Sequence, residues 1–288
     1  MWKVIVMRAA PPWGSGLVKC LLEAGVEVIA HSRSERKLER LKKRLASPFQ
    51  LQTISGAVDL KQLLTLAQGA QVIFYDAYLT YDDRPEKVQH HLEVLRSQAY
   101  IGSDSNMLRI FSPELYGAEA SDTFVYYAFQ RMVHCKTIKQ LFDPAIRQEY
   151  AFFEDALRDT LELAISSAAY GRTWKLHTNG PISQTELLTA AYPDAALPRF
   201  KRVARWKIGL LFLAEPKIRQ LMKKYSSKNR GAITSAINYV GGHLTSYEVG
   251  ATITMERLKQ SVKIRRRQAE HECRSVYVKC VCQRGAWW

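Results

Sequence analysis

Three observations predict an α/β fold in which a doubly wound parallel sheet is followed by a smaller C-terminal region. The first is a short apolar run at Val4–Met7, rich in β-branched residues, which is typical of a fully buried strand. The second is a run of apolar positions at helical spacing that begins after Gly14 and ends at Gly25, where a residue without Cβ adopts the left-handed conformation at little cost. The third is another apolar strand, Glu27–Ala30, which completes a βαβ unit. We expect Val4–Met7 to be a central strand with Glu27–Ala30 parallel beside it and helices on both faces.

Strand and helix patterns continue to alternate along the chain, which is typical of a parallel sheet covered by helices. A helix is expected to begin at Ser183, because Glu186 completes a capping box three residues later. From these patterns we expect three parts: a domain over 1–145, a smaller substrate-side or accessory region over 146–235, and a basic C-terminal extension over 236–288. The expected strands are 51–54, 70–75, 108–111 and 171–176, and the further expected helices are 35–46, 85–98 and 255–270.

The turn after the first strand reads Met7-Arg8-Ala9-Ala10-Pro11-Pro12-Trp13-Gly14. It resembles the strand–TGATGFLG–helix opening of the extended and atypical short-chain dehydrogenase/reductases, the NAD(P)-dependent epimerase/dehydratase group, and the flanking residues align without a gap. The resemblance implies a Rossmann-like sheet and a dinucleotide site. Gly14 keeps the third glycine, through which helix and strand approach closely. Arg8 and Pro11 replace the other two. Pro11 lacks an amide for a pyrophosphate, whereas Arg8 either offers a charge or blocks the site.

The same resemblance implies where a cofactor would bind. Ser32 and Arg33 end the second strand, where NAD-preferring proteins carry an acid for the ribose hydroxyls, and this pair suits a 2′-phosphate. We therefore expect NADP(H) rather than NAD(H). Val58 lies in the turn that would meet the adenine, and Ala77 lies in the loop that would cover the ribose. The candidate cofactor-binding residues are Arg8, Ala10, Trp13, Gly14, Ser32, Arg33, Val58 and Ala77.

Candidate catalytic residues follow the fifth expected strand. The run Ser112-Pro113-Glu114-Leu115-Tyr116-Gly117 resembles the family's S-[ST]-x-x-V-Y-G signature. The resemblance implies that Ser112 hydrogen-bonds the substrate oxygen; the alternative is that Ser112 only caps the end of a strand.

The family's general acid/base is a tyrosine four residues before a lysine, whose charge lowers the pKa of the phenol. No tyrosine of this sequence has a lysine at that position, but Tyr127 has Arg131. Arg131 can supply the positive charge, although its planar guanidinium is not the compact ammonium that the ribose contact needs. The alternative is that Phe124–Phe129 is an aromatic helix packed in the core.

Part of the family's pattern is missing between Leu141 and Tyr150, where the family has a sixth strand and a long substrate loop. The resemblance resumes with a helix for which we expect Asp155 as N-cap, and it covers residues 1–135 and 150–192. From Asn238 onward no motif predicts a chemical role.

Charge is distributed unevenly along the 288 residues, whose 42 Lys/Arg and 27 Asp/Glu give a formal net charge of +15. Residues 199–230 hold 11 basic and one acidic residue, a charge of +10, and residues 255–288 hold 9 and 3, a charge of +6. This asymmetry favours an anionic small substrate, nucleic acid or an anionic membrane surface as partner, or it is a solvated basic face. No nucleic-acid-binding motif accompanies the charge, so nucleic acid and membrane rest on charge alone.

The five cysteines indicate reduced thiols of a cytoplasmic protein. Cys20 and Cys135 are expected to be small buried hydrophobes. Cys273, Cys280 and Cys282 lie near His271, but their spacing matches no paired zinc motif, so we predict no metal. The sequence shows no signal-peptide pattern and no apolar run long enough to span a membrane, which also favours the cytoplasm.

Two functions from different classes remain open. One is an NAD(P)-dependent reductase or epimerase acting on a small carbonyl or hydroxyl substrate, with Ser112, Tyr127 and Arg131 at its centre. The other is a catalytically inactive Rossmann-like protein that senses NADP or binds a partner. The retained Ser112 motif favours the first, whereas the lost glycines, the missing lysine and the shortened middle favour the second. The sequence identifies neither the substrate nor the oligomeric state.

Overall fold

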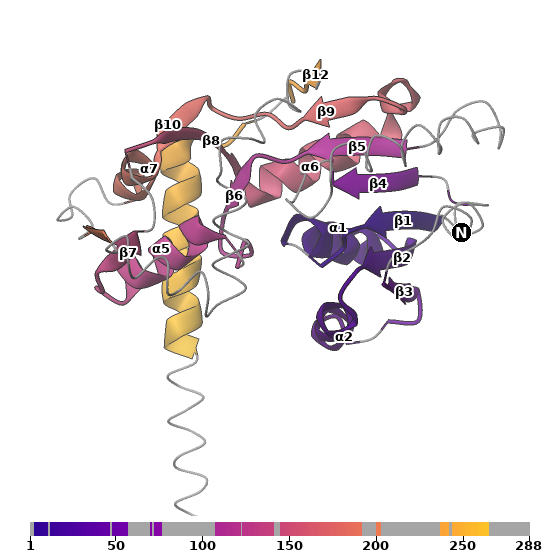
Figure 1. Ribbon diagram of the computed structural model, residues 1–288, viewed down its shortest axis with the longest axis horizontal. Helices are drawn as coiled ribbons and strands as arrows, with labels where there is room; N and C mark the ends of the chain where they lie inside the picture. Colours follow the sequence, from indigo (N-terminus) through magenta and orange to yellow (C-terminus); the bar gives the residue numbers. More distant parts are fainter. Residues whose placement is uncertain are drawn as a thin grey trace, which may run out of the picture.

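A seven-stranded parallel sheet organises the computed structural model, with the strand order β12-β9-β5-β4-β1-β2-β3 (Figure 1). The structure describes residues 3–10, 12–46, 48–56, 70, 72–76, 107–121, 123–140, 145–191, 200–202, 237–241 and 244–264. The strands of this main sheet are β1 (Lys3–Met7), β2 (Glu27–Ser32), β3 (Leu51–Ser55), β4 (Val72–Asp76), β5 (Met107–Phe111), β9 (Thr173–Lys175) and β12 (Ile237–Asn238).

The strand order reverses between β1 and β4, because the chain places β2 and β3 on one side of β1 and then β4 and β5 on the other. Val4 of β1 lies opposite Val28 of β2 and also opposite Val72 of β4, and both pairings are parallel. The predicted α/β fold with a Rossmann-like, doubly wound parallel sheet and a central first strand is therefore confirmed. Ligands of such open sheets bind outside the carboxyl ends of the strands at the reversal.

Helices α1 (Pro12–Glu23) and α6 (Phe153–Ile165) pack against each other on the sheet, and α2 (Glu35–Arg44) packs on β2 and β3. Gly16 lies so close to the ring of Phe153 that a Cβ on Gly16 would overlap it, so this glycine sets the distance between α1 and α6. Gly25 follows α1 with a φ of 75°, as predicted for the residue that ends this helix. The core between these helices and the sheet includes Val4, Val6, Leu17, Val28, Leu108, Ile110, Ala156 and Leu176.

In the part of the chain that the structure describes, a second lobe is built from two small sheets and three helices. β6 (Glu114–Tyr116), β8 (Arg147–Phe152) and β10 (Pro181–Ser183) form one sheet, and β7 (Ile138–Gln140) pairs with β11 (Phe200–Arg202) in the other. The helices are α5 (Phe124–Val133), α7 (Gln184–Ala190) and a helix over 247–264. The capping box at the start of α7 is present as predicted, with Ser183 and Glu186 bonded reciprocally. The core of the lobe includes Tyr116, Val125, Phe129, Tyr150, Phe152, Leu187, Leu188 and Met255.

Both cores draw on residues from either side of residue 145. β6 and α5 belong to the second lobe, whereas α6, β9 and β12 pack on the main sheet. The segment 237–264 joins both, because it supplies β12 to the main sheet and a helix to the second lobe. The division of the chain at residues 145 and 235 stays a prediction.

Two local predictions are wrong. Asp155 is not the N-cap of α6, since the helix begins at Phe153; its buried carboxylate instead accepts hydrogen bonds of 2.8 and 3.0 Å from the amide and hydroxyl of Thr245. Cys135 is exposed rather than buried, because it lies in the turn after α5 with a φ of 51°. In the main sheet β9 lies beside β5. The strand that follows α5, β7, pairs with β11 instead, outside the main sheet.

Candidate functional site

The carboxyl ends of the main strands point toward the second lobe (Figure 1). β5 continues through Ser112 and Pro113 directly into β6, and β9 continues through residues 176–180 into β10. Arg8 follows β1, and Ser32 and Arg33 lie at the end of β2. One edge of the sheet therefore carries candidate residues from β1, β2 and β5, where parallel sheets bind their ligands.

The turn after β1 has the left-handed backbone conformation that favours glycine, although an arginine occupies the position. Arg8 has a φ of 59°, a left-handed conformation that costs a residue with a Cβ about 1 kcal/mol. The next amide, of Ala9, donates to the carbonyl of His31 at 2.7 Å and ties the turn to β2. A Cβ on Gly14 would lie 2.6 Å from the Arg8 carbonyl oxygen and 2.8 Å from Ala9 Cα, so Gly14 allows the close approach of helix and strand.

Arg8, His31 and Arg33 place three basic side chains at the carboxyl ends of β1 and β2. Burial lowers the pKa of His31, and the charges of Arg33 and Arg8 lower it further, against a hydrogen bond to Gly56. The Nε2 of His31 lies 3.0 Å from the Gly56 carbonyl oxygen. Because a carbonyl only accepts, Nε2 carries the proton, and Nδ1 is a buried acceptor without a hydrogen-bond partner among the described residues. Sequence reasoning missed His31, although a polar residue at the end of an apolar strand was a usable signal.

The N-terminus of α1 lies beside these basic groups. α1 begins at Pro12, so the amides of Trp13 and Gly14 precede the first intrahelical hydrogen bonds. The indole of Trp13 is buried and donates to Thr160 Oγ1 at 3.2 Å, which leaves only its backbone available to a ligand. Ala10 is half-buried in the same turn. Helix amides and arginines suit phosphate groups, so the residues present fit the dinucleotide that the fold implies.

Ser112 is buried directly after β5, and its hydroxyl donates to the carbonyl of Pro113 at 3.2 Å. It lies at the carboxyl edge, where the sequence resemblance places a catalytic serine. Its catalytic role stays a prediction.

Tyr127 and Arg131 lie on α5 in the second lobe. The ring of Tyr127 contacts Phe124, with centroids 5.6 Å apart, and packs against the lobe's core. The guanidinium of Arg131 donates from Nε and Nη2 to the carbonyl of Thr137, at 3.0 and 2.8 Å. No hydrogen bond or ring contact among the described residues joins Tyr127 to Ser112 or to Arg131. The structure therefore places these two residues in the second lobe without bringing them into contact with Ser112.

Three other tyrosines of the second lobe hold their protons tightly. Burial raises the pKa of Tyr116 and Tyr150 far above the usual value, and it raises the pKa of Tyr247 to about 12. The hydroxyl of Tyr247 donates to the carbonyl of Gly180 at 2.5 Å. These phenols remain protonated at neutral pH. The hydroxyls of Tyr150 and Tyr247 make hydrogen bonds, whereas that of Tyr116 is buried without a partner among the described residues.

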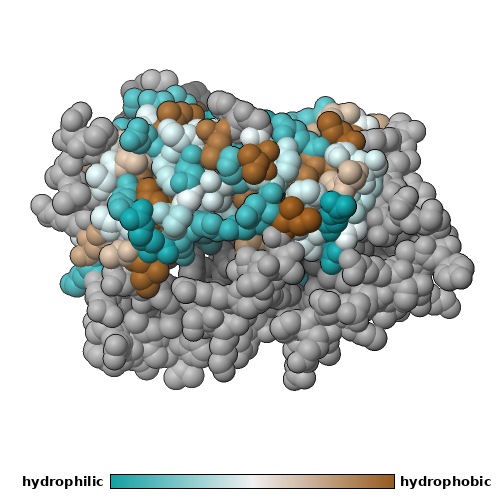
Figure 2. Space-filling model, turned by 90° about the horizontal axis from the view of Figure 1, so that it is seen from above, coloured by the Kyte–Doolittle hydropathy of each residue, from teal (hydrophilic) through white to brown (hydrophobic). Residues whose placement is uncertain are grey.

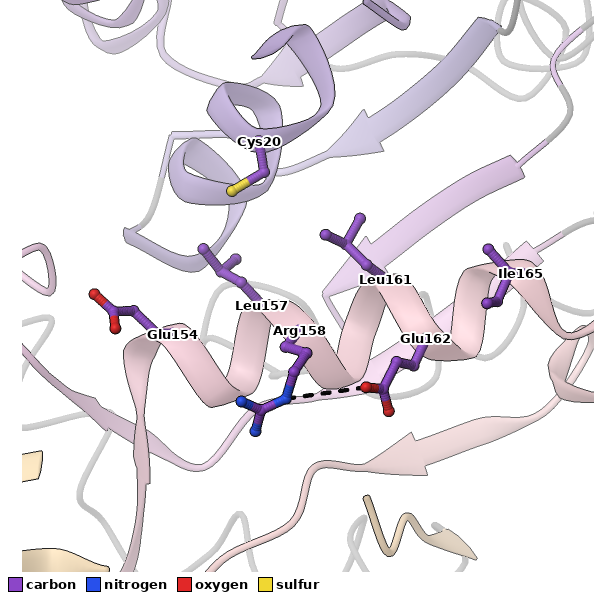
Figure 3. Close-up of a pocket in the computed structure, with 7 residues that line it drawn as sticks. All are labelled: Cys20, Glu154, Leu157, Arg158, Leu161, Glu162 and Ile165. Carbon is purple, nitrogen blue, oxygen red and sulfur yellow. Dashed lines mark ion pairs between the residues drawn. The ribbon is translucent and has the colours of Figure 1, made fainter. Parts of the chain in front are cut away.

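A groove of about 440 Å³ lies between α1 and α6 (Figure 3). Cys20, Leu157, Leu161 and Ile165 give it an apolar lining, and Arg158 and Glu162 flank it with an ion pair of 3.9 Å. Burial raises the pKa of the Cys20 thiol, which keeps it protonated and unreactive. None of the candidate residues lines this groove, so we do not assign the chemistry to it.

Several expectations fall outside the described residues. These are Val58, Ala77, the cysteines and histidine near the C-terminus, and most of the two basic stretches. Within the described ranges, no three His, Cys, Asp or Glu side chains are arranged to hold a metal ion. No described helix is both long and apolar enough to cross a membrane. The face seen in Figure 2 shows apolar side chains as separate spots among polar ones.

Comparisons with known proteins identify the fold. No protein-family model matches the sequence, and no curated protein matches it. Among solved structures, the chain is similar to UDP-glucuronic acid 4-epimerase from Bacillus cereus in complex with a fluorinated UDP-glucuronic acid and NAD, with 14% identity, a TM-score of 0.57, and coverage of 90% of this chain and 99% of that chain.

Two further structures give the same result. An epimerase from Methanothermobacter thermautotrophicus shares 12% identity, with a TM-score of 0.57 over 92% of this chain and 94% of that chain. The terminal reductase domain of the myxalamid biosynthetic pathway shares 10% identity, with a TM-score of 0.55 over 90% of both chains. The resemblance to the extended short-chain dehydrogenase/reductases is thus confirmed for the fold.

Proposed function

We propose that this chain binds NADP(H) at the carboxyl edge of the main sheet and acts as a reductase or epimerase on a small carbonyl- or hydroxyl-bearing substrate. The proposal depends above all on the reversal between β1 and β4, beside which the left-handed turn at Arg8 and the basic side chains of His31 and Arg33 lie. Similar structures contain NAD, which supports a nicotinamide cofactor. Arg33 and Ser32, in place of an acid, favour the 2′-phosphate of NADP(H).

Each candidate residue has a role in this proposal. The cofactor would give or take a hydride when bound. Ser112 orients the substrate oxygen, and Tyr127 exchanges a proton with that oxygen. Arg131, one turn later on α5, supplies the positive charge. The backbone from Arg8 to Gly14 and the side chains of Ser32 and Arg33 hold the phosphates, while Val58 and Ala77 flank the adenine and ribose. Similar structures hold UDP sugars, so anionic sugar nucleotides are the first substrates to test, in a cytoplasmic setting.

Calorimetric titration with NADPH and NADH tests cofactor binding. We expect tighter binding of NADPH, and we expect Arg33→Gln to abolish the preference, since Arg33 would contact the 2′-phosphate. Arg36→Gln, on the exposed first turn of α2, is the matched control and should change neither affinity. Equal or tighter binding of NADH would contradict the choice of NADP(H). Binding of neither dinucleotide would reject the cofactor site.

The second candidate is an inactive NADP-sensing or partner-binding protein. The position of α5 favours it, because Arg131 is bonded to the Thr137 carbonyl and Tyr127 packs against Phe124. Nucleic acid and membrane partners rest on charge outside the described residues, and neither is part of this proposal.

Turnover of UDP-sugar and aldehyde substrates separates the two candidates. If Ser112 and Tyr127 act as one unit, Ser112→Ala and Tyr127→Phe should each lower kcat strongly, and the double variant should lose little more than either. Arg131→Lys should raise activity by restoring a compact ammonium. A wild type that binds NADPH but converts no substrate would favour the sensing protein.

A further inference from the structure

A strap of the chain, residues 237–241 and 244–246, crosses from the main sheet to the second lobe. It begins as β12, which pairs with β9, and the amide of Tyr239 donates to the carbonyl of Lys175 at 2.9 Å. The strap leads into the helix over 247–264, whose apolar side chains lie in the core of the second lobe. The strap is therefore one of the connections between the two lobes.

Two carboxylates of α6 hold the strap. Asp155 accepts hydrogen bonds from the amide and hydroxyl of Thr245, at 2.8 and 3.0 Å. Glu162 accepts a hydrogen bond of 2.6 Å from the hydroxyl of Tyr239. Burial raises the pKa of Tyr239 to about 12, so this hydroxyl remains a donor. Positions 155, 159 and 162 follow each other at steps of four and three residues, which places Asp159 on the same face of α6, between the two contacts.

The backbone of the strap covers Asp159. The side chain of Asp159 is buried, and its Oδ1 has no hydrogen-bond partner among the described residues. A Cβ built on Gly241 would lie 2.9 Å from this oxygen, so the strap lies directly against it. A buried carboxylate loses hydration that its charged form needs, and this burial raises the pKa of Asp159 to about 6. Movement of the strap away from α6 would return water to this oxygen.

The neighbouring charges compensate Asp159 only in part. Arg158 lies 4.0 Å from its Oδ1, but the same guanidinium lies 2.8 Å from Asp155 and 3.9 Å from Glu162, so one cation serves three carboxylates. Arg158 and a hydrogen bond from the amide of His177 lower the pKa of Asp159, whereas the charges of Asp155 and Glu162 raise it. The Nδ1 of His177 is buried without a hydrogen-bond partner among the described residues.

We propose that Asp159 makes the closure of the strap on α6 depend on pH. When Asp159 is protonated, the strap stays closed; when Asp159 is ionised, the strap opens and water reaches the carboxylate. The opening releases Tyr239 and Thr245 from α6 and loosens one connection between the lobes. The inference concerns a movement of the fold, and it depends neither on dinucleotide binding nor on turnover.

Hydrogen exchange of the Tyr239 and Thr245 amides at pH 5 and pH 7.5 tests this proposal, with each rate corrected for the intrinsic effect of pH. Both amides are hydrogen-bonded in the closed strap. With a pKa of about 6 for Asp159 in the closed strap and about 3.8 when hydrated, the opening equilibrium should rise about tenfold over this interval. The amide of Val28, inside the main sheet, is the reference and should be far more protected.

Asp159→Asn keeps the shape of the side chain and removes its charge. In this variant the protection of the Tyr239 and Thr245 amides should be as high at pH 7.5 as at pH 5. Glu248→Gln is the matched control, because it removes one exposed carboxylate directly after the strap, and it should keep the tenfold change.

Three further variants separate Asp159 from other causes. Gly241→Ala places a Cβ against Oδ1 of Asp159, so it should lower the protection of the strap at both pH values. His177→Gln and His243→Gln each remove one imidazole that titrates in the same pH range, and both should keep the tenfold change. His243 lies outside the described residues, between Gly241 and Leu244 in the sequence.

A tenfold change that persists in Asp159→Asn would overturn the proposal, and so would its disappearance in either histidine variant. Exchange of the Tyr239 and Thr245 amides as slow as that of Val28 would also overturn it, since these amides would then open only in global unfolding. If Asp159→Asn does not fold, the pH dependence of the wild type and of the two histidine variants decides the question.

Discussion

The carboxyl edge of the main sheet and helix α5 hold their polar side chains by different means. At the edge, parallel strand pairing runs up to Met7 and Phe111, the residues before Arg8 and Ser112, and it depends on the backbone rather than on the side chains. On α5, the side chains of Tyr127 and Arg131 are themselves part of the packing, through Phe124 and Thr137.

This difference shows which region can keep a binding site while its motif changes. A strand ladder keeps the edge in place even where the turn has Arg8 instead of a glycine. Helix α5 packs in the second lobe, and the strand after it does not join the main sheet, so no strand pairing holds α5 next to the edge. That strand is β7, which pairs with β11, while β9 occupies the position beside β5.

The largest expected effect is a loss of stability on a substitution at the carboxyl edge. Gly14→Ala places a Cβ 2.6 Å from the Arg8 carbonyl oxygen and 2.8 Å from Ala9 Cα, and backbone atoms cannot move aside as a side chain can. We expect a loss of at least about 3 kcal/mol in the free energy of unfolding, measured in urea. Gly25→Ala, at φ 75° with open space around it, is the control and should lose only about 1 kcal/mol. Equal losses would contradict the close approach.

The second prediction concerns α6, which contacts Tyr239, Gly241 and Thr245. Burial raises the pKa of Asp159 to about 6, although Arg158 lowers it. The folded state therefore holds the proton more tightly than the unfolded chain, whose carboxyl titrates near its usual 3.8. Stability from this group is complete below about pH 4 and is lost as the pH rises through about 6.

Asp159→Asn tests this sign, because the amide stays uncharged. At pH 7 the variant should be more stable than the wild type by about 2 to 3 kcal/mol, and at pH 4 the difference should largely vanish. Glu186→Gln is a control of opposite sign, since the hydrogen bonds from Ser183 lower the pKa of Glu186. The loss of stability in Glu186→Gln should therefore be present at pH 7 and become smaller as the pH falls. A difference for Asp159→Asn that does not change with pH would refute the assignment.

The third prediction tests the connection between α6 and the C-terminal segment. Asp155 is buried and binds the amide and hydroxyl of Thr245 as well as Arg158, at 2.8 Å. Asp155→Ala should cost about 2 kcal/mol, because it leaves the half-buried amide of Thr245 without its acceptor. Glu256→Ala, on the exposed side of the helix over 247–264, is the control and should have little effect. Unfolding free energies within error of each other would contradict this role.

The smallest effect has the opposite sign. Arg8→Gly should stabilise the protein by about 1 kcal/mol, because glycine adopts a φ of 59° without the penalty of a Cβ. Ala46→Gly, at φ 56° and away from the edge, should give a similar gain. Thermal unfolding of both variants measures this, and a loss of stability in Arg8→Gly alone would show that the Arg8 side chain contributes more than its backbone strain removes.

The local part of this structure could be predicted from the sequence. The end of α1 at Gly25, the close approach at Gly14 and the capping box at Ser183 depend on residues close in the sequence, and the βαβ unit joins strands that are neighbours along the chain. Periodicity and capping report such short-range preferences directly. For the same reason the edge with Arg8, Ser32, Arg33 and Ser112 could be located before the fold was seen.

Only the tertiary structure decided which distant segments meet. β9 pairs with β5 although more than sixty residues separate them, and Thr245 bonds to Asp155 across 90 residues. Similar long-range contacts place Lys175 opposite Phe111 and pair it with Glu149. Strand partners depend on the apolar surfaces that the whole chain buries together, whereas sequence patterns record only what each segment favours by itself.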